Sequence, residues 1–112
     1  MSYLRIPAPD SRRSASFYAD VFGWTVDTDR DDPSFADGTG HVIGHFMSDL
    51  PVAGDAGVRP YVYVDDVNDT LDRALSGGAT PATAPYPEGN LTVATFRDPA
   101  GNEIGIWQQG GA

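Results

Sequence analysis

The segment VYVDDVNDTLDRALSGGA, residues Val62 to Ala79, holds a short strand followed directly by a capped helix. Alternating tyrosines and valines over 61–64 predict the strand. Asp65 or Asp66 then stands at the expected helix N-cap, because its carboxylate can accept hydrogen bonds from amides of the first turn. Gly77 and Gly78 predict the end of the helix. Apolar residues at helical spacing between these signals are Val67, Leu71, Ala74 and Leu75.

The same pattern occurs near the N-terminus. Residues 3–8 predict a strand that ends at Pro7 and Pro9, and Asp10 occupies the next N-cap position. Gly23 predicts the helix C-terminus. Between Asp10 and Gly23, apolar or small residues occur at helical spacing: Ser14, Phe17, Tyr18, Val21 and Phe22. The caps Asp10 and Asp66 are 56 residues apart (66 − 10), which is half of the 112-residue chain.

Three strands are predicted after each helix. Those after the first are 24–28, 34–36 and 41–47, with an Asp37–Gly38 hairpin signal, and those after the second are 80–83, 91–97 and 102–108. Loops are predicted at 85–90 and 98–101, and a Pro- and Gly-rich linker at 50–60. We therefore expect an α+β fold in which one domain, 1–112, contains two like modules, about 1–50 and 59–110.

Side chains alternate between the two faces of three of these strands. The even positions are aliphatic, as expected of the face that the helices cover: Leu4, Ile6, Val62, Val64, Ile104 and Ile106. The odd positions are aromatic or charged: Tyr3, Arg5, Arg59, Tyr61, Tyr63, Glu103 and Trp107. A face of this kind is typical either of a ligand-lined concavity or of a subunit interface, and the sequence leaves both open.

Composition excludes several classes of function. There are 16 Asp and Glu against seven basic residues, all Arg, for a net charge of −9. Because a phosphate-binding face must be basic, we expect no nucleic-acid partner and no anionic membrane partner. Lys and Cys are absent, which removes Schiff bases, thiol nucleophiles and Cys-ligated metals. No apolar signal segment starts the chain, so a cytoplasmic location is expected.

Three segments resemble the vicinal oxygen chelate superfamily, which includes glyoxalases, bleomycin-resistance proteins and extradiol dioxygenases. They are FYADVFGW (17–24), VYVDDVNDTLDRALSGGA (62–79) and FRDPAGNEIGIW (96–107), of which the last is the most specific. The resemblance implies two βαβββ modules whose eight strands form an open, curled mixed sheet around one cavity, with helices on its outer face. It also implies a homodimer.

Enzymes of this superfamily hold a divalent metal with His, His or Gln, and Glu from the first and last strands of the modules. Glu103 matches the last-strand Glu, whereas Tyr3 and Arg59 occupy the two His positions. The 56-residue offset makes Met47 the counterpart of Glu103 (103 − 56). Arg59 cannot donate a lone pair to a metal, so it is expected to pair with Glu103 instead.

A metal site at these positions would need His45 as a replacement ligand. His45 is two residues from Met47 and lies on the same strand face. His41 has the same parity. Two His at positions i and i+4 of a strand lie about 13 Å apart, so His41 and His45 cannot share one ion.

We therefore expect a small organic molecule to bind without a cofactor and without an intact metal centre. The candidate ligand-binding residues are Tyr3, Arg5, Arg59, Tyr61, Tyr63 and Trp107. The alternative is a metal-dependent lyase, isomerase or dioxygenase that uses Glu103 as catalytic residue, with Glu103 and His45 as metal ligands. A third reading is a purely structural dimerisation module. Turn formers, with no chemistry, are expected at Asp98, Pro99, Gly101 and Asn102.

Overall fold

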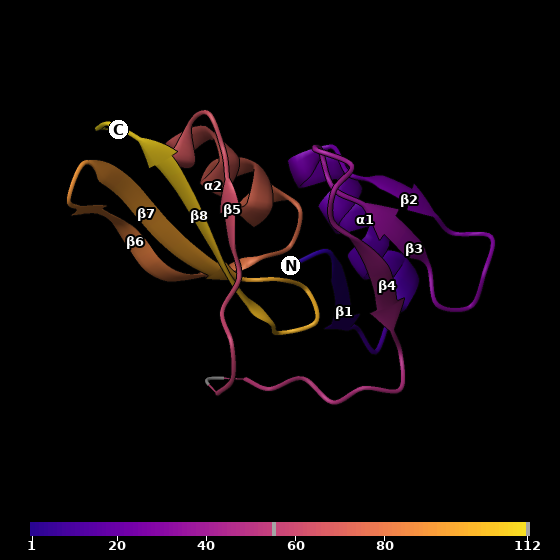
Figure 1. Ribbon diagram of the computed structural model, residues 1–112. Coiled ribbons are helices and arrows are strands. Elements are labelled where there is room, and N and C mark those ends of the chain that lie inside the picture. Colours follow the sequence, from indigo (N-terminus) through magenta and orange to yellow (C-terminus); the bar gives the residue numbers. More distant parts are fainter. Residues whose placement is uncertain (55, 112) are drawn as a thin grey trace. The chain divides into compact units, whose positions relative to one another are not determined.

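The computed structural model describes residues 1–54 and 56–111. Its residues divide into two compact units, Met1–Val52 and Ala53–Ala112, and each unit contains one four-stranded sheet and one helix. Both units have the order strand, helix, three strands, which confirms the predicted α+β fold and its two βαβββ modules (Figure 1). Segment 50–60 contains no helix or strand among its described residues.

The first unit is built around a sheet of order β1-β4-β3-β2, in which β1 and β4 are parallel and the other pairs antiparallel. Its elements are β1 (Tyr3–Pro7), α1 (Ser11–Phe22), β2 (Thr25–Asp27), β3 (Ser34–Ala36) and β4 (Ile43–Met47). Helix α1 begins where Asp10 accepts from the Arg13 amide (3.2 Å) and ends at Gly23 with φ 72°. Both predicted caps are therefore confirmed.

An aromatic cluster forms the core of the first unit. The fully buried Tyr18 ring lies 4.9 Å from Trp24 and 5.3 Å from Phe46, between ring centroids. Phe35 stacks on Trp24 at 4.8 Å. These rings lie on the face of the sheet that α1 covers, and the other face carries Tyr3, Ile43 and His45.

The second unit repeats this plan with a sheet of order β5-β8-β7-β6, in which β5 and β8 are parallel. Its elements are β5 (Tyr61–Tyr63), α2 (Val67–Ser76), β6 (Thr80–Glu88), β7 (Leu91–Arg97) and β8 (Glu103–Gln109). Of the two candidate caps, Asp66 is the N-cap of α2, because its carboxylate accepts from the Asp69 amide (3.0 Å). Helix α2 packs on β6, β7 and β8.

Two predicted boundaries are wrong. Strand β6 runs to Glu88, through the predicted loop at 85–90, because it is an edge strand, where prolines are tolerated, and it pairs with β7 across two irregularities. Only Gly89 and Asn90 remain as its turn, with Gly89 at φ 58°. Strand β4 begins at Ile43, so His41 lies in the preceding loop and not on the strand of His45.

Asp37 organises the loop between β3 and β4. Its Oδ1 accepts hydrogen bonds from the amides of Thr39, Gly40 and Val42 and from the Thr39 hydroxyl. Burial by itself raises the pKa of this carboxyl, but the hydrogen bonds from the Thr39 hydroxyl and the three amides outweigh it. The pKa of Asp37 is therefore lowered from its ordinary value of 3.8.

We expect Asp37→Asn to lower the free energy of unfolding by about 1 kcal/mol at neutral pH, because the charge that strengthens four hydrogen bonds is lost. A carboxyl whose folded pKa is lowered contributes stability above its unfolded pKa. That contribution is lost as pH falls through the folded value, so the difference between the two proteins shrinks below pH 3.8. Urea unfolding across this pH range checks the prediction, with the exposed Asp65→Asn as control. A difference that does not change with pH would contradict it.

Candidate functional site

The alternation predicted for the strands is present within each unit. In β1, Ile6 is buried while Tyr3 is 45% exposed. In β8, Ile104 and Ile106 are buried, and on the opposite face of the same sheet Tyr61 and Tyr63 of β5 are 43% and 54% exposed. The odd-numbered side chains therefore lie on the sheet face that the helix of their own unit does not cover.

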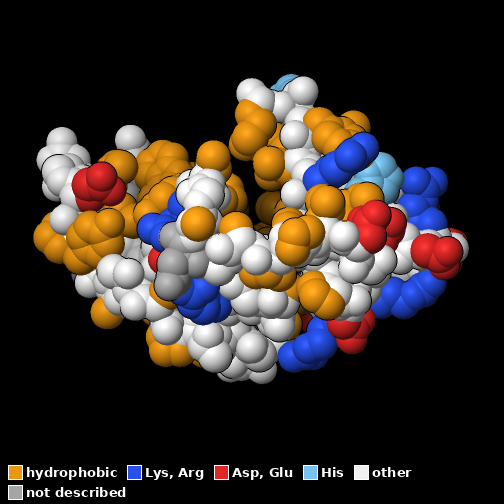
Figure 2. Space-filling model, turned by 90° about the horizontal axis from the view of Figure 1, so that it is seen from below, with side chains coloured by type: hydrophobic (Ala, Val, Ile, Leu, Met, Phe, Trp, Pro, Cys, Tyr) orange, Lys and Arg blue, Asp and Glu red, His pale blue; other side chains and the backbone are white. Residues whose placement is uncertain are grey.

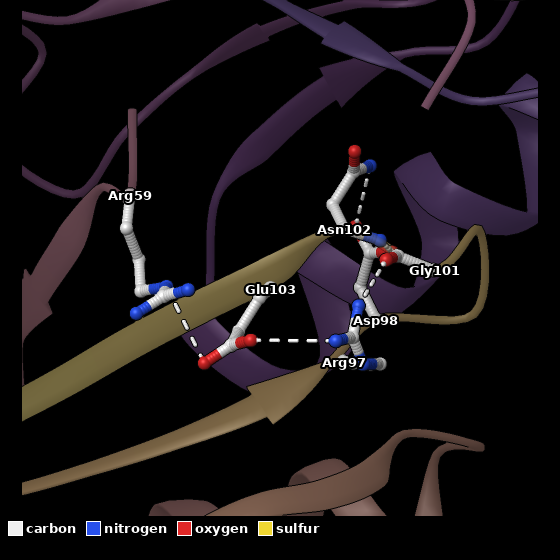
Figure 3. A network of polar contacts seen from close by, with 6 residues as sticks. All are labelled: Arg59, Arg97, Asp98, Gly101, Asn102 and Glu103. Carbon is white, nitrogen blue, oxygen red and sulfur yellow. Dashed lines mark hydrogen bonds and ion pairs between the residues drawn. The ribbon is translucent and has the colours of Figure 1, made fainter. Parts of the chain in front are cut away.

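Glu103 lies between two guanidinium groups (Figure 3). Its Oε2 is 3.3 Å from Arg59 Nε, and its Oε1 is 3.5 Å from Arg97 Nη2. The Glu103 side chain is only 11% exposed, while the two arginine side chains are 39% and 32% exposed. The predicted pairing of Glu103 with Arg59 is confirmed. Each carboxylate oxygen therefore faces one guanidinium group.

Arg97 was not among the residues predicted from the sequence. It lies directly opposite Glu103 in the β7–β8 ladder, and its Nη1 donates to the Gly101 carbonyl at 3.3 Å. The sequence does contain a sign of this pairing, because residues that flank a short hairpin turn at equal distances face each other. To predict the Arg97–Glu103 pair from it, the register of the hairpin must be known, and spacing along one strand does not provide that register.

The turn between β7 and β8 holds this arrangement in place. Asp98 is 4% exposed, and its Oδ1 accepts from the amides of Ala100 and Asn102, while its Oδ2 accepts from Asn102 Nδ2. These contacts agree with the turn-forming role expected of Asp98 and Asn102. The turn thereby orients Gly101, which in turn positions Arg97 (Figure 3).

Aromatic side chains continue the same face of the second unit. The Tyr61 ring lies over Gly105, so closely that a Cβ added at Gly105 would meet the ring. Tyr63 and Trp107 are paired across β5 and β8, with ring centroids 4.9 Å apart in an edge-to-face arrangement. Beside them, the hydroxyl of the buried Thr95 has no hydrogen-bond partner among the described residues.

In the first unit, His45 joins two side chains. Its Nδ1 is 2.8 Å from Tyr3 Oη, and its Nε2 is 3.2 Å from Arg30 Nη1. A guanidinium can only donate, so Nε2 accepts and the ring proton is on Nδ1, which donates to Tyr3 Oη. The space-filling view shows a histidine side chain at the surface beside arginine side chains (Figure 2).

These residues line a cavity of about 430 Å³ in the first unit. It is open to solvent, and its lining residues are Tyr3, Arg5, Arg30, Asp32, His45 and Met47. Arg30 and Asp32 come from the loop between β2 and β3, and no sequence pattern pointed to them. The predicted site residues thus form two groups, one in each unit, and their convergence on one hollow stays a prediction.

The counterpart of Glu103 in the first unit is Ile43, which corrects the assignment of Met47. The amides of Ala8 and Val64 donate to the carbonyls of Met47 and Trp107 at equivalent points of the two units. The offset is 56 residues in the first strands (64 − 8) but 60 in the last strands (107 − 47), because the second unit has a longer stretch between helix and last strand. With the offset of 60, Glu103 corresponds to Ile43, which is 49% exposed.

Neither helix of the described chain has the length and apolar character that crossing a bilayer requires.

Comparison with known proteins places these observations in a family. Residues 3–107 match the glyoxalase-like domain family. CFP32 of Mycobacterium bovis is 26% identical over 120 residues, which cover 96% of this chain. The match covers 44% of CFP32, so the chain spans less than half the length of this relative.

Two solved structures share the fold. A glyoxalase/bleomycin resistance protein/dioxygenase family enzyme from Burkholderia phytofirmans has a TM-score of 0.78 at 23% identity, covering 96% of this chain and 97% of that chain. TnmS3, an antibiotic binding protein from a Streptomyces species, has a TM-score of 0.76 at 21% identity, covering 97% and 94%. The chain belongs to the glyoxalase-like domain family, within the vicinal oxygen chelate superfamily that its motifs predicted.

Proposed function

We propose that this protein binds a small organic molecule on the aromatic and arginine-bearing sheet face, without a divalent metal centre. The observation that carries the proposal is the position of Glu103 between Arg59 and Arg97. The carboxylate that a metal would need is already engaged by two cations, while Tyr61, Tyr63 and Trp107 offer aromatic surface beside it.

The donor set does not fit a divalent ion. Of the four positions that supply ligands in the metal enzymes of the family, three hold Tyr3, Ile43 and Arg59. A divalent cation about 4 Å from one guanidinium is repelled by roughly 8 kcal/mol at an effective dielectric constant of 20. No three His, Asp or Glu side chains among the described residues are grouped to hold an ion.

His45 does not repair this donor set. Both of its ring nitrogens are engaged, and coordination through Nε2 would displace Arg30 and leave two cations facing each other. The alternative reading, a lyase, isomerase or dioxygenase with Glu103 and His45 as ligands, therefore lacks support from the residues around both side chains.

Metal content of the purified chain tests this part of the proposal. We expect elemental analysis to find no stoichiometric nickel, zinc, manganese or iron, and calorimetric titration with each metal to give no saturable binding. The variant Glu103→Ala should behave in the same way. A stoichiometric metal that is lost in Glu103→Ala would overturn the proposal in favour of the metal-dependent enzyme.

Trp107 provides a reporter for ligand binding. The chain has two tryptophans, of which Trp24 is buried in the aromatic core of the first unit. In a Trp24→Phe background, we expect planar aromatic compounds to quench Trp107 fluorescence saturably, because they stack on Tyr61, Tyr63 or Trp107. Tyr63→Ala should weaken binding at least about fivefold, whereas Tyr86→Ala, on the edge strand β6, should not.

The same surface could instead be covered by a second copy of the chain, as the expected homodimer implies. Tyr61 and Tyr63 are the exposed aromatic residues on it. Sedimentation analysis of wild type and Tyr63→Ala distinguishes the two uses. A dimer that Tyr63→Ala dissociates, together with Trp107 fluorescence that no ligand changes, would replace ligand binding with subunit contact.

A further inference from the structure

We propose that the cavity of the first unit, lined by Tyr3, Arg5, Arg30, Asp32 and His45, binds a carboxylate group. This inference goes beyond the proposed function, which concerns residues of the second unit, and names the chemical class of a ligand for the first unit. The proposal follows from the hydrogen-bonding capacity of the lining side chains, the charge of the cavity and the way its loop is held.

The cavity presents more hydrogen-bond donors than its own acceptors engage. His45 Nδ1–H donates to Tyr3 Oη, so the hydroxyl hydrogen of Tyr3 is free to point elsewhere. Arg30 uses one guanidinium nitrogen on His45, which leaves its remaining N–H groups for a ligand. The complement of several convergent donors is a group with acceptors only, and an ionised carboxylate is such a group.

Two cations of the cavity pair with none of the carboxylates that the structure describes. Arg5 lies 5.9 Å from the Tyr3 ring centroid and, like Arg30, forms no ion pair with any described carboxylate. This is unexpected in a chain that carries 16 acids against seven arginines. An anion from outside the chain would supply a partner for both side chains.

The charge of the cavity selects the kind of anion. Two arginines and Asp32 give a formal charge of +1 (2 − 1) among the lining residues. Asp32 Oδ1 already accepts from the amide and hydroxyl of Ser48, at 3.1 and 3.0 Å. A monovalent carboxylate matches this charge, whereas a phosphate dianion would leave excess negative charge beside Asp32.

The loop that carries Arg30 is fixed before any ligand binds. Arg12 of α1 donates to the carbonyls of Thr28 and Arg30, at 2.9 and 3.5 Å. Ser11 donates to the Asp31 carbonyl at 3.0 Å. Because α1 holds the loop on both sides of Arg30, little conformational entropy is lost when a ligand meets its guanidinium.

Nuclear magnetic resonance of the two histidine side chains tests the proposal with benzoate and its neutral analogue benzamide. We expect the free protein to show His45 with its proton on Nδ1. Benzoate should shift the His45 signals saturably and leave those of His41, in the exposed loop, unchanged. Benzamide should have no such effect. Equal shifts from both compounds, or equal shifts of both histidines, would overturn the proposal.

Calorimetry with arginine variants measures the contribution of each cation. Arg30→Gln and Arg5→Gln should each weaken benzoate binding about tenfold or more, because a charge-assisted hydrogen bond is lost. The matched control Arg13→Gln, on the exposed side of α1, should leave binding unchanged. Equal affinities of all three variants would contradict the inference. If aromatic ligands quench Trp107 but benzoate does not shift the His45 signals, only this inference is wrong. If benzoate shifts the His45 signals but no ligand quenches Trp107, the proposed second-unit site is wrong.

Discussion

Replacing Gly44 by alanine is expected to lower the free energy of unfolding by about 3 kcal/mol, the largest effect predicted for this chain. Gly44 lies in the central strand β4, where a Cβ would meet the carbonyl oxygen of Leu4 and the ring of Phe35, 2.7 Å away. The Leu4 oxygen belongs to the backbone of β1, so relief requires the two strands to separate. Phe35 is itself stacked on Trp24 and cannot move freely.

Gly38→Ala is the matched control. Gly38 lies in the loop between β3 and β4, where an added Cβ meets no atom within 4 Å. In urea unfolding, Gly44→Ala should be less stable than wild type, whereas the unfolding free energy of Gly38→Ala should stay within about 0.5 kcal/mol of wild type. Similar stability of the two variants would mean that β1 and β4 do not approach as closely as described.

The helices and their caps were predictable from the sequence because the interactions that define them are local. Asp10 and Asp66 each accept from an amide three residues ahead, and Gly23 takes the left-handed conformation that few other residues tolerate. The strand faces were predictable for a similar reason, since alternation is a property of one strand alone.

Features that depend on pairing between distant segments were not predictable. Strand β6 continues through its prolines because β7 supplies partners, which composition cannot reveal. Glu103 was matched to Met47 and not to Ile43 because a fixed offset takes no account of the longer stretch before the last strand of the second unit. Arg30 could not be predicted because no spacing rule relates a loop residue to His45.

The second large effect is expected for Glu103→Ala, which should lower the free energy of unfolding by about 2 kcal/mol. Truncating one partner of a fully buried ion pair costs roughly 3–5 kcal/mol, because the remaining charge is left uncompensated. Arg59 and Arg97 are 39% and 32% exposed, so water screens part of that charge and the loss is smaller. Glu103→Gln keeps the shape and an acceptor oxygen, and should lose about half as much.

Glu88→Ala, at the exposed end of edge strand β6, is the control for removing a carboxylate from this unit. We expect it to leave stability within about 0.5 kcal/mol of wild type. The double variant Arg59→Gln/Glu103→Gln should lose less unfolding free energy than the two single variants together. Either change alone already removes the ion pair between the two side chains. Additive losses would show that the contact at 3.3 Å contributes no coupling. In that case Glu103 would be paired with Arg97 alone, and only one of the two cations that oppose a metal ligand at this position would remain.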